Sequence, residues 1–248
     1  MTSADPGSAP GKGVLDRLPD RSADNRDRDW LLAWSHPRFR WAVTMSVTVG
    51  LSSPFVLPLI FNALNRRVGW HPPDPVLTVL APHQVSWAIF ALLLPTLVVV
   101  AGGCLNRPWV LIRGAVACAA LYSIRALTMT VVPLAAPPGL IPLRDPLGQL
   151  FYPGRVPETR DLFFSGHTAI MFLLIALVRR RAAKAAVALV ACAVGMLLLV
   201  QHAHWTVDVL SAPVFAALCW WLSGLLLPNP FRSGAPPVVP APDALASG

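Results

Sequence analysis

The sequence predicts an all-α, polytopic integral membrane protein, in which a bundle of six transmembrane helices lies between polar N- and C-terminal tails. Of the 248 residues, 55% are hydrophobic and only 13% are charged, whereas about a quarter of the residues of a soluble domain are charged. The hydrophobic residues form long runs with almost no charge, each close to the roughly 20 residues that a helix needs to cross the hydrocarbon core. Composition and segmentation therefore predict the same fold class.

Three regions follow one another along the chain. Residues 1–40 mix six Asp with seven Lys and Arg, a composition that predicts a disordered cytoplasmic tail. Residues 41–227 form the predicted membrane domain, and the Pro/Ala-rich residues 228–248 form a second tail. The predicted spans are 41–63, 84–102, 108–134, 162–178, 185–201 and 205–227.

The positions of the basic residues predict the orientation. The net charge is +8, but the basic residues gather at the ends of hydrophobic runs, which indicates membrane orientation and argues against a nucleic-acid partner. The N-terminal tail and the cluster at 179–184 carry most of them. Both termini are therefore expected in the cytoplasm, and the segments 64–83, 135–161 and 202–204 on the extracytoplasmic side of the cell membrane.

The last span begins with a pair of residues that could carry chemistry. Asp208 is the only acidic residue in the six predicted spans, and His204 lies four residues before it. On a helix this spacing puts both side chains on one face, about 40° apart, whereas His202 points elsewhere. A carboxylate behind one imidazole nitrogen leaves the other free to attack as a nucleophile. The structural alternative is a pair that only fixes the helix end at the interface.

A second motif is expected at the same membrane face. Ser165 and Gly166 are typical of a helix start, whose unpaired N–H groups can hold a phosphate, and His167 follows in the first turn. Arg125, inside the third span, is a candidate for binding phosphate charge. Arg160 is a second candidate, although it fits a solvated loop charge equally well. Asp161 could orient a histidine or a head-group amine, or simply favour a helix start.

Three segments resemble the sphingomyelin synthase-like branch of the type 2 phosphatidic acid phosphatase superfamily. They are R-A-L-T-M-T-V-V-P-L (125–134), D-L-F-F-S-G-H-T (161–168) and H-W-T-V-D-V (204–209). The likeness extends over 41–227. The broader Lys-x6-Arg-Pro phosphatase motif is absent, because the lysines of the chain are Lys12 and Lys184, and this favours the synthase-like branch.

The resemblance implies a mechanism. His204 would attack the lipid phosphorus with Asp208 behind it, while His167 protonates the departing alcohol. The resulting phosphohistidine would pass its group to a lipid alcohol, or to water in a lipid phosphatase or C-type phospholipase. Membrane phospholipids are the expected partners, and no metal or cofactor is expected because neither the histidines nor the four cysteines show metal-ligand spacing.

Two other classes of function, a transporter and a scaffold, fit the sequence less well. A transporter usually has ionisable residues throughout the membrane depth, whereas here they gather at one face, apart from Arg113, which we interpreted as an anchor at the membrane interface. A catalytically silent scaffold would not need the complete His/His/Asp set. Both are therefore weaker hypotheses than an enzyme.

Overall fold

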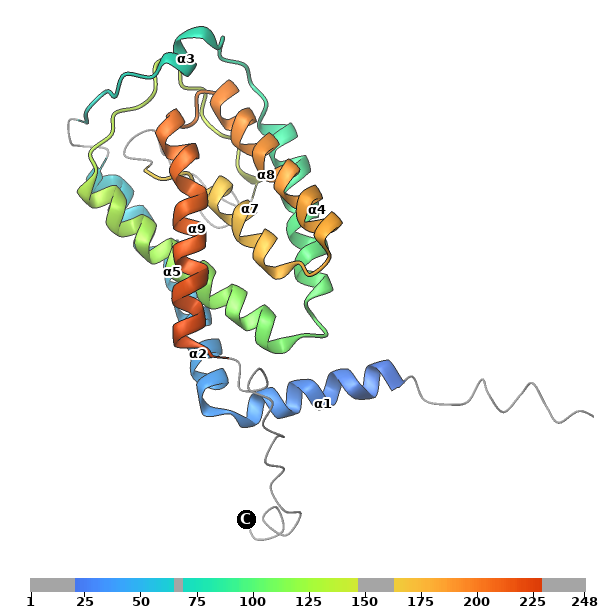
Figure 1. Cartoon of the computed structure of the whole chain (residues 1–248). Helices are drawn as coiled ribbons and strands as arrows, with labels where there is room; N and C mark the ends of the chain where they lie inside the picture. The colour runs from blue at the N-terminus through green and yellow to red at the C-terminus, as the bar shows by residue number, and fades with distance from the viewer. Residues whose placement is uncertain (1–20, 65–68, 147–162, 229–248) are drawn as a thin grey trace, which may run out of the picture.

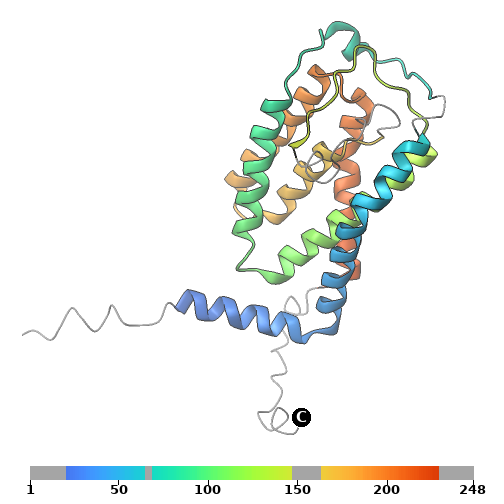
Figure 2. The ribbon, with the colours of Figure 1, turned by 180° about the vertical axis from the view of Figure 1, so that it is seen from behind.

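The protein is described here from a computed structural model, which covers residues 21–64, 69–146 and 163–228. All named elements are helices: α1 (Arg21–Ser35), α2 (Pro37–Leu64), α3 (Pro75–Val79), α4 (Ser86–Gly103), α5 (Pro108–Val131), α7 (Gly166–Leu177), α8 (Arg181–Val200) and α9 (Thr206–Leu226). Helix α7 contacts α4, α5, α8 and α9, and α2 packs on α5. In Figures 1 and 2, α1 lies across one end of the bundle and α3 lies at the opposite end.

The helices show a multi-pass membrane protein. Within the described residues, α4, α5, α8 and α9 are long and apolar enough to cross a membrane, and they correspond to four of the six predicted spans. The first predicted span, 41–63, falls inside α2. The all-α class is confirmed, while the count of six spans stays a prediction.

Helix α7 is shorter than the predicted span 162–178. It has 12 residues, a length of about 18 Å at 1.5 Å per residue, against roughly 30 Å for the hydrocarbon core. The shortening arises at the N-terminal end, where the Ser165 side chain accepts a hydrogen bond from the Thr168 N–H and caps the helix. This cap places the start of α7 inside the bundle, next to α5 and α9.

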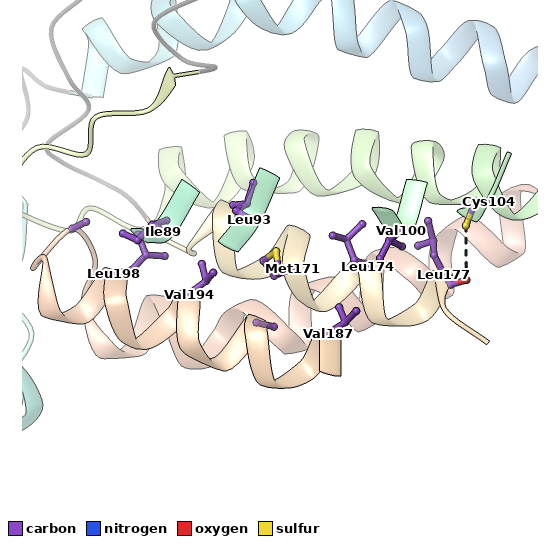
Figure 3. Packing of buried hydrophobic residues seen from close by; sticks show 12 residues of the cluster. Ile89, Leu93, Val100, Cys104, Met171, Leu174, Leu177, Val187, Val194 and Leu198 are labelled. Carbon is purple, nitrogen blue, oxygen red and sulfur yellow. Dashed lines mark hydrogen bonds between the residues drawn. The ribbon is translucent and has the colours of Figure 1, made fainter. Parts of the chain in front are cut away.

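The core between α4, α7 and α8 is apolar. Leu93 of α4, Met171 of α7 and Val194 of α8 are buried in one cluster, which Figure 3 shows with its neighbours. At the end of the cluster the Cys104 thiol lies 3.9 Å from the carbonyl oxygen of Leu177. This packing fixes α7 against the two longer helices.

The prediction of a disordered tail over 1–40 is wrong for residues 21–40, which form α1 and the first turn of α2. Ala33 and Phe39 are fully buried, and the Phe39 ring lies 5.3 Å from the ring of Trp109. The Trp30 indole N–H donates to the carbonyl oxygen of Leu105 at 2.9 Å. Aromatic burial against α5 therefore orders this polar stretch. Residues 1–20 lie outside the described residues, as does the C-terminal tail beyond Pro228.

Arg113 joins two helices, while its position at the membrane interface stays a prediction. Its guanidinium carbon lies 3.9 Å from the centre of the Trp220 ring, and one of its nitrogens donates to the Trp220 carbonyl oxygen at 3.0 Å. A cation over an indole ring is favourable, more so where water is scarce. Arg113 thus binds α5 to α9.

Candidate active site

The start of α9 holds the first part of the site. His204 Nδ1 lies 3.4 Å from Asp208 Oδ2, and the same oxygen accepts the Trp205 N–H at 3.1 Å. His204 is 4% exposed and Asp208 is fully buried. Within the described part of the chain, the other oxygen of Asp208 has no hydrogen-bond partner. The arrangement directs the carboxylate at one imidazole nitrogen and leaves Nε2 of His204 for a reacting atom.

His202 lies outside this pair. Its backbone has a φ of 54°, and its two ring nitrogens lie 2.6 Å from the Pro138 carbonyl oxygen and 3.0 Å from the Leu80 carbonyl oxygen. The ring therefore joins two loops and does not face Asp208. The sequence had separated His202 from His204 by helical phase; in the structure the separation comes from the contacts of the loop.

The start of α7 is bound directly to the start of α9. The backbone N–H of Ser165 donates to the carbonyl oxygen of Asp208 at 3.0 Å. The Ser165 hydroxyl lies 3.0 Å from the Thr168 hydroxyl, and Ser165 is fully buried. This hydrogen bond brings the Ser165–His167 segment beside the His204–Asp208 pair, although about 40 residues separate them in the chain.

Arg125 of α5 lies against the same turn. Its Nε donates to the carbonyl oxygen of Phe164 at 3.1 Å. A Cβ on Gly166 would come within 3.3 Å of that Nε, so glycine lets the guanidinium approach the helix start closely. One turn further on, Thr128 donates to the Phe163 carbonyl oxygen at 3.0 Å. Arg125 thus points toward the α7 start and not toward lipid.

His167 has a neighbour that the sequence did not reveal. Its Nε2 lies 3.6 Å from a carboxylate oxygen of Asp145, and its ring meets the Phe90 ring edge-on at 5.6 Å. Asp145 lies in a loop, 22 residues before His167, so no helical spacing connects the two. The site therefore contains two histidine–aspartate pairs.

Burial and neighbouring charges act on the pKa of His204. Burial lowers the pKa of His204, which lies between α8 and α9; the hydrogen bond to Asp208 opposes this shift, and the charges of Arg125 and His167 reinforce it. The net direction is downward, so His204 is neutral near pH 7. A neutral imidazole is the nucleophilic form.

A loop over the outer end of the bundle carries Asp145; we call residues 132–146 the outer strap. The α8–α9 loop fastens it, since Gln201 donates to the carbonyl oxygens of Ile141 and Pro142 at 3.3 Å each, and the Trp205 indole donates to that of Ala135 at 2.8 Å. The loop that holds His204 therefore also positions the strap.

Asp74 anchors the other loop at this end. One of its oxygens accepts the N–H groups of Val76 and Leu77, and the other accepts the Thr206 N–H at 2.7 Å. One carboxylate thereby caps both α3 and α9. Burial alone would raise the pKa of Asp74, but the backbone hydrogen bonds from Thr206 and Leu77 outweigh it and lower the pKa below 3.8.

Replacing Asp74 with Asn should lower the free energy of unfolding by about 1 to 2 kcal/mol at pH 7, because an amide cannot accept at both helix starts. A lowered carboxyl pKa stabilises the fold above the unfolded value of 3.8, and this contribution disappears as the pH falls through the folded value. Unfolding of purified protein in detergent micelles measures the difference, which should shrink below pH 4. Asp29→Asn, in the exposed part of α1, is the matched control, and an equal loss in both variants would contradict the cap.

Two predicted site residues, Arg160 and Asp161, lie outside the described residues. Across 21–64, 69–146 and 163–228, no three His, Cys, Asp or Glu side chains come together in a way that could hold a metal ion. The structure brings together seven residues of the described ranges: Arg125, Asp145, Ser165, Gly166, His167, His204 and Asp208.

Comparison with known proteins identifies this part of the chain. Residues 160–225 match the family described as PAP2 superfamily C-terminal. A solved structure, LpxE from Aquifex aeolicus, aligns over 67% of this chain and 93% of its own, with 18% sequence identity and a TM-score of 0.42. No curated protein matches the chain. The matched segment contains α7, α8 and the His204–Asp208 pair, so this part of the chain is similar to the C-terminal region of the PAP2 superfamily.

Proposed function

We propose that the protein transfers a phosphoryl or phosphoalcohol group from one membrane lipid to another through a phosphohistidine, as the resemblance to sphingomyelin synthase-like enzymes implies. The observation that carries this proposal is the convergence of a buried His204–Asp208 pair with His167 and Arg125. A nucleophile, its orienting carboxylate, an acid and a fixed cation are the groups that phosphoryl transfer through a covalent intermediate requires.

The first half-reaction uses both histidines. Nε2 of His204 attacks phosphorus, so that a P–N bond forms and the P–O bond to the lipid alcohol breaks. His167 gives its proton to the departing oxygen, and the positive charge on His204 is stabilised by Asp208. The guanidinium of Arg125 stabilises the negative equatorial oxygens as charge develops.

The second half-reaction returns the enzyme to its starting state. His167 takes the proton of an acceptor hydroxyl, whose oxygen attacks phosphorus, and the P–N bond breaks. The acceptor decides the class of reaction. His204 is only 4% exposed, and a site that water reaches poorly favours a lipid alcohol over hydrolysis.

The orientation belongs to the same proposal. The predicted charge asymmetry places both termini in the cytoplasm and the site at the extracytoplasmic face. Cysteine labelling at positions 135–146 from outside intact cells should succeed, because this part of the outer strap lies at that face. Labelling that needs permeabilised cells would reverse the orientation.

The direct test follows the phosphorus. Protein reconstituted in bilayers is incubated with head-group-labelled phospholipids, with and without ceramide or diacylglycerol. Label in a new lipid supports transfer, label in water-soluble phosphate or phosphoalcohol means hydrolysis, and no product at all contradicts the proposed function. A lipid product should appear only when an acceptor lipid is present.

Asp145→Asn should reduce turnover of a natural phospholipid about tenfold, because the carboxylate that faces the proton donor His167 is lost. The p-nitrophenolate group of a p-nitrophenyl ester departs without needing a proton. The same variant should therefore lose far less activity on such a substrate. Comparing kcat on the two substrates checks the prediction. Equal losses on both would mean that Asp145 only supports the fold, and Asp145→Glu should recover part of the activity.

A further inference from the structure

A cavity of about 260 Å³ opens beside His167, between the start of α4 and the end of the outer strap. We call it the α4 cavity; its lining residues are Gln84, Ser86, Trp87, Phe90, Arg144 and Pro146. The buried Phe90 ring lines the cavity and also meets the His167 imidazole edge-on, with 5.6 Å between the ring centres. The carboxylate that faces His167 belongs to Asp145, which lies between two lining residues. The cavity therefore adjoins the proton donor and not the nucleophile.

The position relative to His167 indicates which part of a substrate the cavity would take. In the proposed reaction His167 protonates the oxygen of the departing lipid alcohol, and that oxygen is joined to the apolar body of the lipid. A substrate bound at His167 therefore needs apolar groups close to this imidazole. Phe90 and Trp87 supply such a wall.

Trp87 connects the cavity to the bilayer. It lies in the first turn of α4 and is 77% exposed. Exposing so large an apolar side chain to water is unfavourable, whereas exposing it to lipid is not. Tryptophan is enriched where membrane helices meet the head-group region. The mouth of the cavity therefore lies at the depth where phospholipid head groups and the first part of their chains are found.

Arg144 gives the cavity a charge. Its backbone N–H is fixed by the Ser86 hydroxyl at 3.1 Å, which Gln201 in turn holds at 2.8 Å. Within the described part of the chain, its guanidinium makes no hydrogen bond or ion pair. An uncompensated guanidinium at the edge of an apolar cavity is complementary to an anionic lipid, because it binds phosphate oxygens in a forked geometry.

We propose that the α4 cavity is the docking site of the substrate phospholipid, with its apolar body against Trp87 and Phe90 and its phosphate passing Arg144 on the way to His204. This inference rests on the proposed function, since it uses the role of His167. It adds a role for one residue: the Arg144 guanidinium binds the phosphate of the lipid at the edge of the cavity.

Binding can be tested without turnover. Full-length His204→Ala protein in vesicles is exposed to photoactivatable phosphatidate, and the labelled peptides are identified by mass spectrometry. Label should concentrate on residues 84–90, and Trp87→Ala or Arg144→Gln should each reduce it about fivefold, the effect of about one surface cation or one lost apolar contact. The matched controls are Trp221→Ala and Arg180→Gln, which change an exposed tryptophan and an exposed arginine at the other end of the bundle.

The outcomes separate the two proposals. If the unmodified protein turns lipid over but the label maps outside residues 84–90, the docking site is wrong and the proposed function is not contradicted. Label on 84–90 without any lipid turnover in the unmodified chain contradicts the proposed function. If Arg144→Gln leaves the labelling unchanged, Arg144 has no role in binding the lipid, and full displacement by inorganic phosphate would reduce the cavity to a simple anion site.

Discussion

His204→Ala should lower lipid turnover by at least about a thousandfold, because it removes the Nε2 that forms the P–N bond in the proposed reaction. His202 cannot replace it, since both of its ring nitrogens lie against carbonyl oxygens of neighbouring loops. Rapid quenching of the unmodified protein during turnover should trap labelled phosphorus on His204. That label should be lost in acid and kept in alkali, as expected of a P–N bond.

The control must remove an imidazole from the same face without touching the site. His83→Ala does so, because His83 is exposed and its ring contacts only the Ala81 carbonyl oxygen two residues away. This variant should keep its activity. If His204→Ala retains more than a few per cent of normal turnover, or if labelled phosphorus is found on another residue, the covalent mechanism is wrong.

The parts of the site that were predictable from sequence are local. His204 and Asp208 are four residues apart and their side chains meet as the spacing predicted, although His204 lies just before Trp205, the N-cap of α9, and not in the helix itself. Ser165 was predicted as a helix start, and it caps α7. Hydropathy found α4, α5, α8 and α9 because each is a nearly uncharged run of sufficient length.

The parts that sequence reasoning missed depend on contacts between distant segments. Asp145 reaches His167 through the outer strap, and Asp74 reaches Thr206 across 132 residues. Nothing in the local pattern of either aspartate indicates its partner. The Asp74–Pro75 pair is a signal for a helix start, but it predicts only α3 and not the second helix that Asp74 caps.

The N-terminal error has a different cause. Composition averages over a segment, and residues 21–40 are polar on average. A few aromatic residues decide the outcome, because Trp30 and Phe39 pack with Trp109 of α5. Aromatic side chains contribute large buried areas one by one, which an average over composition does not show.

Asp208→Asn should reduce turnover by roughly 10² to 10⁴-fold while the protein still folds. The carboxylate accepts from His204 Nδ1–H and thereby leaves Nε2 unprotonated and able to attack. An asparagine can instead donate its amide N–H to Nδ1, which favours the tautomer that carries its proton on Nε2. The loss should therefore appear in kcat, with the KM for the lipid nearly unchanged.

Damage to the start of α9 would also lower activity, so the comparison needs a second variant. Asp74→Asn removes a carboxylate from the same helix start, where it holds the Thr206 N–H, but Asp74 does not contact His204. If Asp208 acts through the imidazole, Asp208→Asn should lose far more activity than Asp74→Asn at a similar loss of stability. Matching losses in the two variants would mean that Asp208 only caps α9 through the Trp205 N–H, and that His204 attacks without an acidic partner. Trapping of labelled phosphorus on His204 distinguishes these cases, because a slow attack reduces the trapped fraction, whereas an unfolded site removes binding as well.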